Sequence, residues 1–229
     1  MPGMDASSKS GLKTPRAAAV AGILFSMLFL AALVLLLQSV QIMPTDPGKW
    51  LASDAWKVAL ALNLIPFAGI SFLWFIGVLR DRMGQAEDRL FSTVFLGSGL
   101  LFVGLFFVAA SGTGAILVTH VTAPVEFPTS VAFTFARSLV YYLTSVYALK
   151  MAAVFMLTAS TMILRTKFTA RWCAFAGYIA ASAILVGSQF ISWALFLFPV
   201  WVLLVSLNIL AEEFRRPIEK AETHTASMQ

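Results

Sequence analysis

The sequence predicts an all-helical, polytopic integral membrane protein with six transmembrane helices and with both termini in the cytoplasm. The chain of 229 residues is 59% hydrophobic and only 12% charged, whereas soluble domains usually carry about 25% charged residues. The apolar residues fall into blocks near the ~20 residues that one helical crossing requires. The basic residues gather at alternate ends of these blocks. Composition, block length and charge pattern therefore agree on the fold class.

The first span is predicted at Ala17–Leu37, after a polar cytoplasmic segment, 1–16, that carries three basic residues. Its 21 residues exceed the 7–15 apolar residues of a signal peptide. No small-x-small cleavage site follows, so we expect an uncleaved helix. The second span is predicted at Trp56–Leu79, after an outer loop rich in Pro and Gly.

The third and fourth spans are predicted at Phe91–Thr119 and Leu139–Leu164. The outer loop between them, 120–138, contains Pro124, Glu126 and Pro128, and we expect it to cover the outer mouth of the bundle. The stretch 172–210 is too long for one crossing, and Gly187–Ser192 interrupts it with turn-forming residues. We therefore predict a hairpin of spans Trp172–Val186 and Trp193–Leu210. The bundle occupies 17–211, and 212–229 form a polar, partly disordered cytoplasmic tail.

The orientation follows from the loops. In the six-span arrangement twelve Lys and Arg residues lie on the side of the termini and three lie on the other side. Cytoplasmic loops carry this excess, so we expect a multi-pass protein of a bacterial inner (plasma) membrane. Six aromatic residues at predicted span edges are typical of interfacial belts: Trp50, Trp56, Tyr141, Tyr142, Trp172 and Trp193.

Lys150 lies deep inside the predicted fourth span, whereas Lys57 falls at the outer edge of the second. A charge at a helix centre costs roughly 2.5–3.5 kcal/mol on the insertion scale, and such residues usually mark functional sites. Tyr147, one turn away, is its nearest polar neighbour on the helix. All eleven acidic residues lie outside the spans. The pair is a candidate for ion or solute interaction. The alternative is structural, because the lysine stem points toward the outer end and can snorkel there.

Two further candidates, Asn63 and Pro66, lie in the second span. A proline frees a backbone carbonyl, and freed carbonyls coordinate ions where they line a cavity. A packing kink is the simpler interpretation. In the third span Gly97, Gly104 and Ser111 repeat every seven residues, and this small face predicts close helix packing.

Several classes of function are disfavoured. One cysteine and two histidines leave few metal or haem ligands, so we expect no cofactor and no metal site. The His-Glu-x-x-His, G-x-x-x-x-G-K-[ST] and G-x-S-x-G motifs are missing, so we expect no enzyme. The basic residues sit in short loops beside the spans, which excludes a nucleic-acid partner.

The short first span, the second span with its proline, the inner loop Arg80-Asp81-Arg82 and the closing hairpin resemble a family of six-span bacterial and lysosomal potassium channels. That family carries a Phe-Ser-Asp motif in its first helix, where this chain has Phe25-Ser26-Met27. The acidic residue of the motif is therefore replaced, and we transfer no functional residue from the family.

We expect a small channel or transporter for ions or small solutes. The alternative is a non-catalytic accessory or scaffold subunit of a larger membrane complex, which the shortage of intramembrane polar groups favours. The expected partners are the lipid bilayer and either further copies of the chain or other membrane subunits. A lipid-modifying enzyme is the third and weakest hypothesis.

Overall fold

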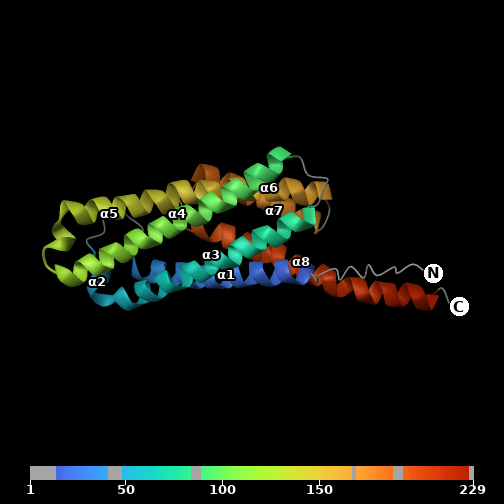
Figure 1. Ribbon diagram of the computed structural model, residues 1–229, viewed down its shortest axis with the longest axis horizontal. Helices are drawn as coiled ribbons and strands as arrows, with labels where there is room; N and C mark the ends of the chain where they lie inside the picture. Colours follow the sequence, from blue (N-terminus) through green and yellow to red (C-terminus); the bar gives the residue numbers. More distant parts are fainter. Residues whose placement is uncertain (1–13, 41–47, 84–88, 167–168, 188–192, 227–229) are drawn as a thin grey trace, which may run out of the picture.

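The protein is an all-helical, polytopic membrane bundle (Figure 1). The structure, a computed structural model, describes residues 14–40, 48–83, 89–166, 169–187 and 193–226. Five helical stretches are long and apolar enough to cross a membrane, and a sixth apolar helix has 17 residues. The elements in chain order are α1 (Thr14–Ser39), α2 (Trp50–Ser53), α3 (Ala55–Met83), α4 (Arg89–Thr122), the 3₁₀ turn η2 (Phe127–Thr129), α5 (Val131–Tyr141), the π-helix η3 (Tyr142–Ala148), α6 (Leu149–Thr166), α7 (Arg171–Gly187) and α8 (Ala194–Ala226).

Each predicted span corresponds to a helix, and the predicted hairpin is formed by α7 and α8. At ~1.5 Å per residue, the 17 residues of α7 rise about 26 Å, slightly less than the ~30 Å hydrocarbon core. The first residues of α1 and the last of α8 lie at the same end of the bundle (Figure 1). An even number of crossings requires this arrangement. The end opposite the termini is called the outer end below.

The outer connection between the third and fourth spans is shorter than predicted. α4 continues to Thr122 and α5 begins at Val131, so most of the predicted loop is helical. The hydroxyl of Ser130 caps α5 by accepting a hydrogen bond from the backbone N–H of Phe133 at 3.1 Å. Phe133 then packs in a small outer core with Phe127 and Trp50. A side-chain cap and one buried aromatic residue thus start a helix directly after the two prolines of the predicted loop.

At the other end α8 continues through Ala226, beyond the rest of the bundle (Figure 1). The polar tail predicted to begin at residue 212 therefore starts inside a helix. The sequence after Leu210 contains Ala, Glu, Lys and Arg, which are strong helix formers. Their propensity continues the helix where hydropathy marks only the end of the apolar span.

The six long elements form a closed ring. α1 packs between α3 and α8, α4 lies between α3 and α6, and α7 closes the ring between α6 and α8. The interior is filled by a phenylalanine core from five helices, with neighbouring ring centroids 4.6–6.1 Å apart. Its fully buried members include Phe25, Phe72, Phe95, Phe155 and Phe198. In lipid, such packing rather than the exclusion of water holds helices together.

Glycines allow the helices to approach closely, although not at the predicted stripe. A side chain at Gly22 of α1 would collide with Ser206 of α8, and one at Gly177 of α7 would collide with Ser160 of α6. By contrast, a Cβ at Gly97 or Gly104 would meet nothing within 4 Å. Gly97 and Gly104 therefore make no close contact with the described helices, and close packing at this face stays a prediction. Elsewhere in the same span, a Cβ at Gly99 would collide with Ile76, and one at Gly112 would press against Val140.

Candidate functional site: a cavity in the outer half

A cavity of about 130 Å³ lies in the outer half of the bundle. Its wall takes Leu36 from α1, Ile65 from α3, Ala110 from α4, Arg137 from α5 and Leu195 from α8. An apolar cavity of ~150 Å³ accommodates benzene, and a water molecule occupies ~30 Å³. The space therefore suits one ligand of about the size of a benzene ring, or a few water molecules.

The π-helix η3 shapes one wall of this cavity. Residues 131–166 form one continuous helical stretch whose turn widens over Tyr142–Ala148. Tyr141, Thr144 and Ser145 all line the cavity. The Thr144 hydroxyl donates a hydrogen bond to the Val140 carbonyl at 2.8 Å, which gives that carbonyl a side-chain partner in the widened turn. π-Helical insertions occur frequently at functional sites, and here the insertion coincides with the cavity.

Three polar side chains of the wall are more than nine-tenths buried. Arg137 is 8% exposed, Ser145 is 5% exposed and Trp50 is 3% exposed. The indole Nε1 of Trp50 and the hydroxyl of Ser145 have no hydrogen-bond partner among the residues that the structure describes. For the indole Nε1 of Trp50, which is fully buried, the missing partner costs about 1–3 kcal/mol. The mainly apolar cavity therefore keeps hydrogen-bonding capacity that a ligand could use.

Arg137 adds a positive charge to this wall. Its guanidinium lies 5.9 Å from the ring centroid of Phe133, one turn earlier on α5. None of the acidic side chains that the structure describes lines the cavity. A guanidinium carries five N–H donors in a fixed plane, so it can serve a ligand in addition to the contacts it makes within the protein.

A polar junction positions Trp50. The Asp54 carboxylate accepts hydrogen bonds from Lys57 Nζ and Ser53 Oγ, each at 2.7 Å, at the corner between α2 and α3. These hydrogen bonds hold the pKa of the Asp54 carboxyl below its usual value, against a weaker opposing effect of burial. The same corner directs Trp50 and Leu51 into the outer core.

Phenylalanines close the inner side of the cavity. Phe106 of α4 belongs to its wall. One turn further inward, Phe102 lies 5.5 Å from Phe106 and 4.7 Å from Phe198, measured between ring centroids. Phe29 of α1 packs edge-on against both Phe102 and Phe106. The outer cavity thus ends on a layer of packed rings.

The four candidates predicted from the sequence do not line this cavity. Lys150 is partly exposed at the start of α6, and it makes no hydrogen bond or ion pair with another described residue. Tyr147 is 57% exposed. Both positions agree with the snorkelling alternative, and their predicted part in transport stays a prediction.

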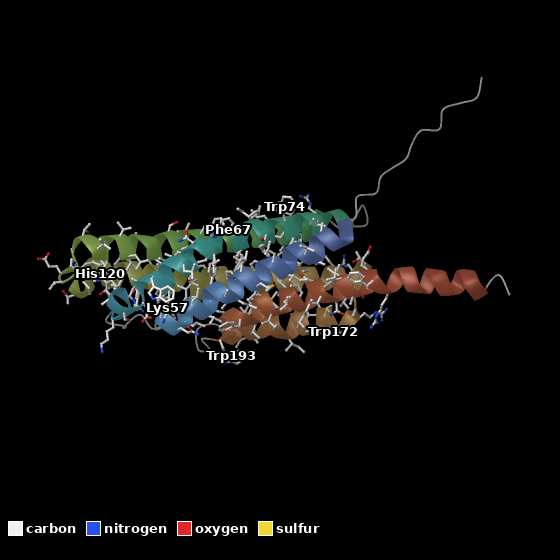
Figure 2. All side chains as sticks on the ribbon, turned by 90° about the horizontal axis from the view of Figure 1, so that it is seen from below. Lys57, Phe67, Trp74, His120, Trp172 and Trp193 are labelled. Atoms are coloured by element: carbon white, nitrogen blue, oxygen red, sulfur yellow. The ribbon has the colours of Figure 1, made fainter. Side chains whose placement is uncertain are left out.

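Asn63 and Pro66 lie on the outward face of α3. The Asn63 amide donates to the carbonyl of Ala59 at 2.8 Å, within its own helix. The same side of α3 exposes Phe67 and Trp74, which point away from the bundle in Figure 2. The carbonyl that the proline frees belongs to Leu62, one turn earlier, and Leu62 is itself one of the residues of the cavity wall.

Sequence reasoning missed Arg137, Ser145 and Trp50. Arg137 was assigned to an outer loop, and Trp50, with Tyr141, to the interfacial belt, whereas both aromatic residues line the cavity. Trp56, Tyr142, Trp172 and Trp193 are exposed, as belt residues should be. One available signal was the spacing of Arg137, Tyr141 and Ser145, four residues apart, which places them on one helix face.

The fold and the cavity together define a multi-pass helical membrane protein with a small, largely apolar site in its outer half. Comparison with protein families, with curated proteins and with solved structures finds no match for this chain.

Proposed function

We propose that the protein is a carrier that binds a small, largely apolar solute in the outer cavity and moves it across a bacterial inner membrane. The observation that carries the proposal is the cavity itself, whose wall includes the buried residues Arg137 and Ser145 and the indole N–H of Trp50, which has no hydrogen-bond partner among the described residues. Pockets for small molecules are typically apolar with a few placed polar groups. The excess of basic residues at the end of the bundle that holds both termini supports a cytoplasmic location for that end.

The phenylalanine layer favours a carrier over an open channel. Rings 4.7–5.8 Å apart between α1, α4 and α8 fill the space inward of the cavity. A solute in the cavity can pass only if these helices move relative to one another. That requirement is the rocking of one group of helices against another by which carriers expose a site alternately to each side.

Flux into proteoliposomes tests the proposal. The purified protein is reconstituted and offered a panel of K⁺, Na⁺, Cl⁻, leucine, phenylalanine and benzoate. We expect uptake of at least one organic solute, loss of this uptake in Ala110→Phe, which fills the cavity, and normal uptake in Ala115→Phe. Ala115 is the matched control because it is exposed on the same helix. Uptake that is equal in all three proteins would contradict the proposal.

A second candidate function is an accessory or scaffold subunit. The specific observation in its favour is the extension of α8 beyond the bundle, where no other described helix accompanies it (Figure 1). An isolated helix in water gains most of its stability from a partner. Absence of flux for the whole panel, together with copurification of a stoichiometric membrane protein, would favour this function over the carrier.

A further inference from the structure

We propose that the ligand of the outer cavity is a small organic carboxylate with an aromatic or branched apolar body, of about the size of benzoate. This inference rests on the proposed binding of a solute in the cavity and specifies its chemical class. It is carried by the size of the cavity, by its apolar wall and by the three buried polar side chains that share that wall.

The size of the cavity matches a small apolar body. A cavity of about 130 Å³ is close to the ~150 Å³ that accommodates benzene. Leu33, Leu36, Ile65, Ile116 and Leu195 contribute aliphatic surface to the wall, and such surface favours a ring or a branched chain over a strongly hydrated ion. The packed Phe102 and Phe106 rings beneath it prevent a longer chain from extending inward.

The polar groups select the head of the ligand. Trp50 Nε1 can only donate a hydrogen bond, Ser145 Oγ can donate or accept, and the Arg137 guanidinium can only donate. All three residues belong to the cavity wall. Two strict donors, one of them charged, match an acceptor that carries negative charge. A carboxylate fits this requirement, because its two oxygens accept several hydrogen bonds at once and pair with arginine in a planar geometry.

The environment strengthens this selection. The guanidinium is 8% exposed and lies among apolar side chains, where charge–charge attraction is less screened than in water. An amine would be repelled by Arg137. A neutral ring without acceptor atoms would leave Trp50 Nε1 and Ser145 Oγ without partners, and that loss discriminates against it.

Equilibrium binding of ring-labelled benzoate to the protein in nanodiscs tests the inference, with empty nanodiscs as the blank and labelled toluene as the matched ring without a carboxylate. We expect saturable binding of benzoate at one site per chain and at least tenfold weaker binding of toluene. Trp50→Phe and Ser145→Ala should each weaken benzoate binding several-fold, because each removes one hydrogen bond to a charged acceptor. Trp201→Phe should bind as the wild type does, since the indole N–H of Trp201 is bonded to the Cys173 carbonyl outside the cavity.

Arg137→Gln should weaken benzoate binding more than Trp50→Phe or Ser145→Ala does. If Arg137→Gln does not fold, Trp50→Phe and Ser145→Ala still test whether the cavity binds the carboxylate. Benzoate binding equal to that of empty nanodiscs, or unchanged in all the folded cavity variants, would overturn the inference. If another solute of the panel is carried and benzoate does not bind, the ligand class is wrong and the carrier stands. If benzoate binds and no solute of the panel is carried, the ligand class stands and the carrier is wrong.

Discussion

Phe72 provides the sharpest test of the packing that closes the inner side of the cavity. Its side chain is fully buried on α3, and its ring neighbours are Phe25, Phe75, Phe102, Phe155 and Phe198, with centroids 4.7–6.1 Å away. An aromatic pair contributes about 0.5–1.5 kcal/mol, so five pairs set an upper bound of roughly 2.5–7.5 kcal/mol. Truncation of a buried phenylalanine to alanine typically costs ~3–5 kcal/mol.

We therefore expect Phe72→Ala to lower the free energy of unfolding by about 3–5 kcal/mol. Phe67→Ala is the matched control, because Phe67 lies on the same helix and is 63% exposed. Its truncation should change the free energy by less than about 1 kcal/mol, since an outward residue exchanges contact with lipid or detergent only. Reversible unfolding in mixed micelles, followed by circular dichroism, measures both variants. Equal losses in the two would refute the placement of Phe72 in a common core.

Three further predictions follow from other contacts. Gly177→Leu should lower the free energy of unfolding by about 1–3 kcal/mol or more, because the new side chain would collide with Ser160. Gly104→Leu is the control and should not destabilise the protein, because a Cβ there meets nothing within 4 Å. The same unfolding measurement compares the two variants. Trp201→Phe should cost about 0.5–1.5 kcal/mol through the loss of its 3.0 Å hydrogen bond to a buried carbonyl, and an unchanged unfolding midpoint would contradict this. Because the pKa of Asp54 is lowered, its ion pair with Lys57 is fully formed at pH values above the ordinary aspartate pKa and is lost as the pH falls through the lowered pKa. An NMR titration of the Asp54 carboxyl in micelles should show the lowered pKa, and Lys57→Met should remove part of the shift.

The course of the chain through the membrane could be predicted from the sequence because it depends on local quantities. Span length follows from hydropathy, and the shared side of the termini follows from the distribution of Lys and Arg. Even the short α7 was identified by the polar interruption at Gly187. The helix α5 was not, because a segment with Pro124 and Pro128 has a weak helical signal. Its cap at Ser130 and the burial of Phe133 depend on the structure around them.

The site could not be located from the sequence because the depth of a residue in a span does not give its direction. Lys150 and Ser145 lie on the same continuous helical stretch, and only the rotation of each about the axis places Ser145 in the cavity and Lys150 outside it. The π-helix between Tyr142 and Ala148 changes that rotation, and no periodicity argument based on 3.6 residues per turn includes such an insertion. The same limit applies to the glycines of α4, whose heptad spacing indicates a face without telling which neighbour it meets.

Counterflow of a carried solute into proteoliposomes tests most directly whether the outer cavity is the functional site. The decisive comparison is between Ala110→Phe, which fills the cavity, and Lys150→Met, which removes a charge that lies inside a span and outside the cavity. Both proteins are first shown to elute as the wild type does in mild detergent. We expect Ala110→Phe to abolish counterflow and Lys150→Met to retain it. Retained counterflow in Ala110→Phe together with its loss in Lys150→Met would show that the outer cavity is not the functional site and would place that site on the Lys150 face.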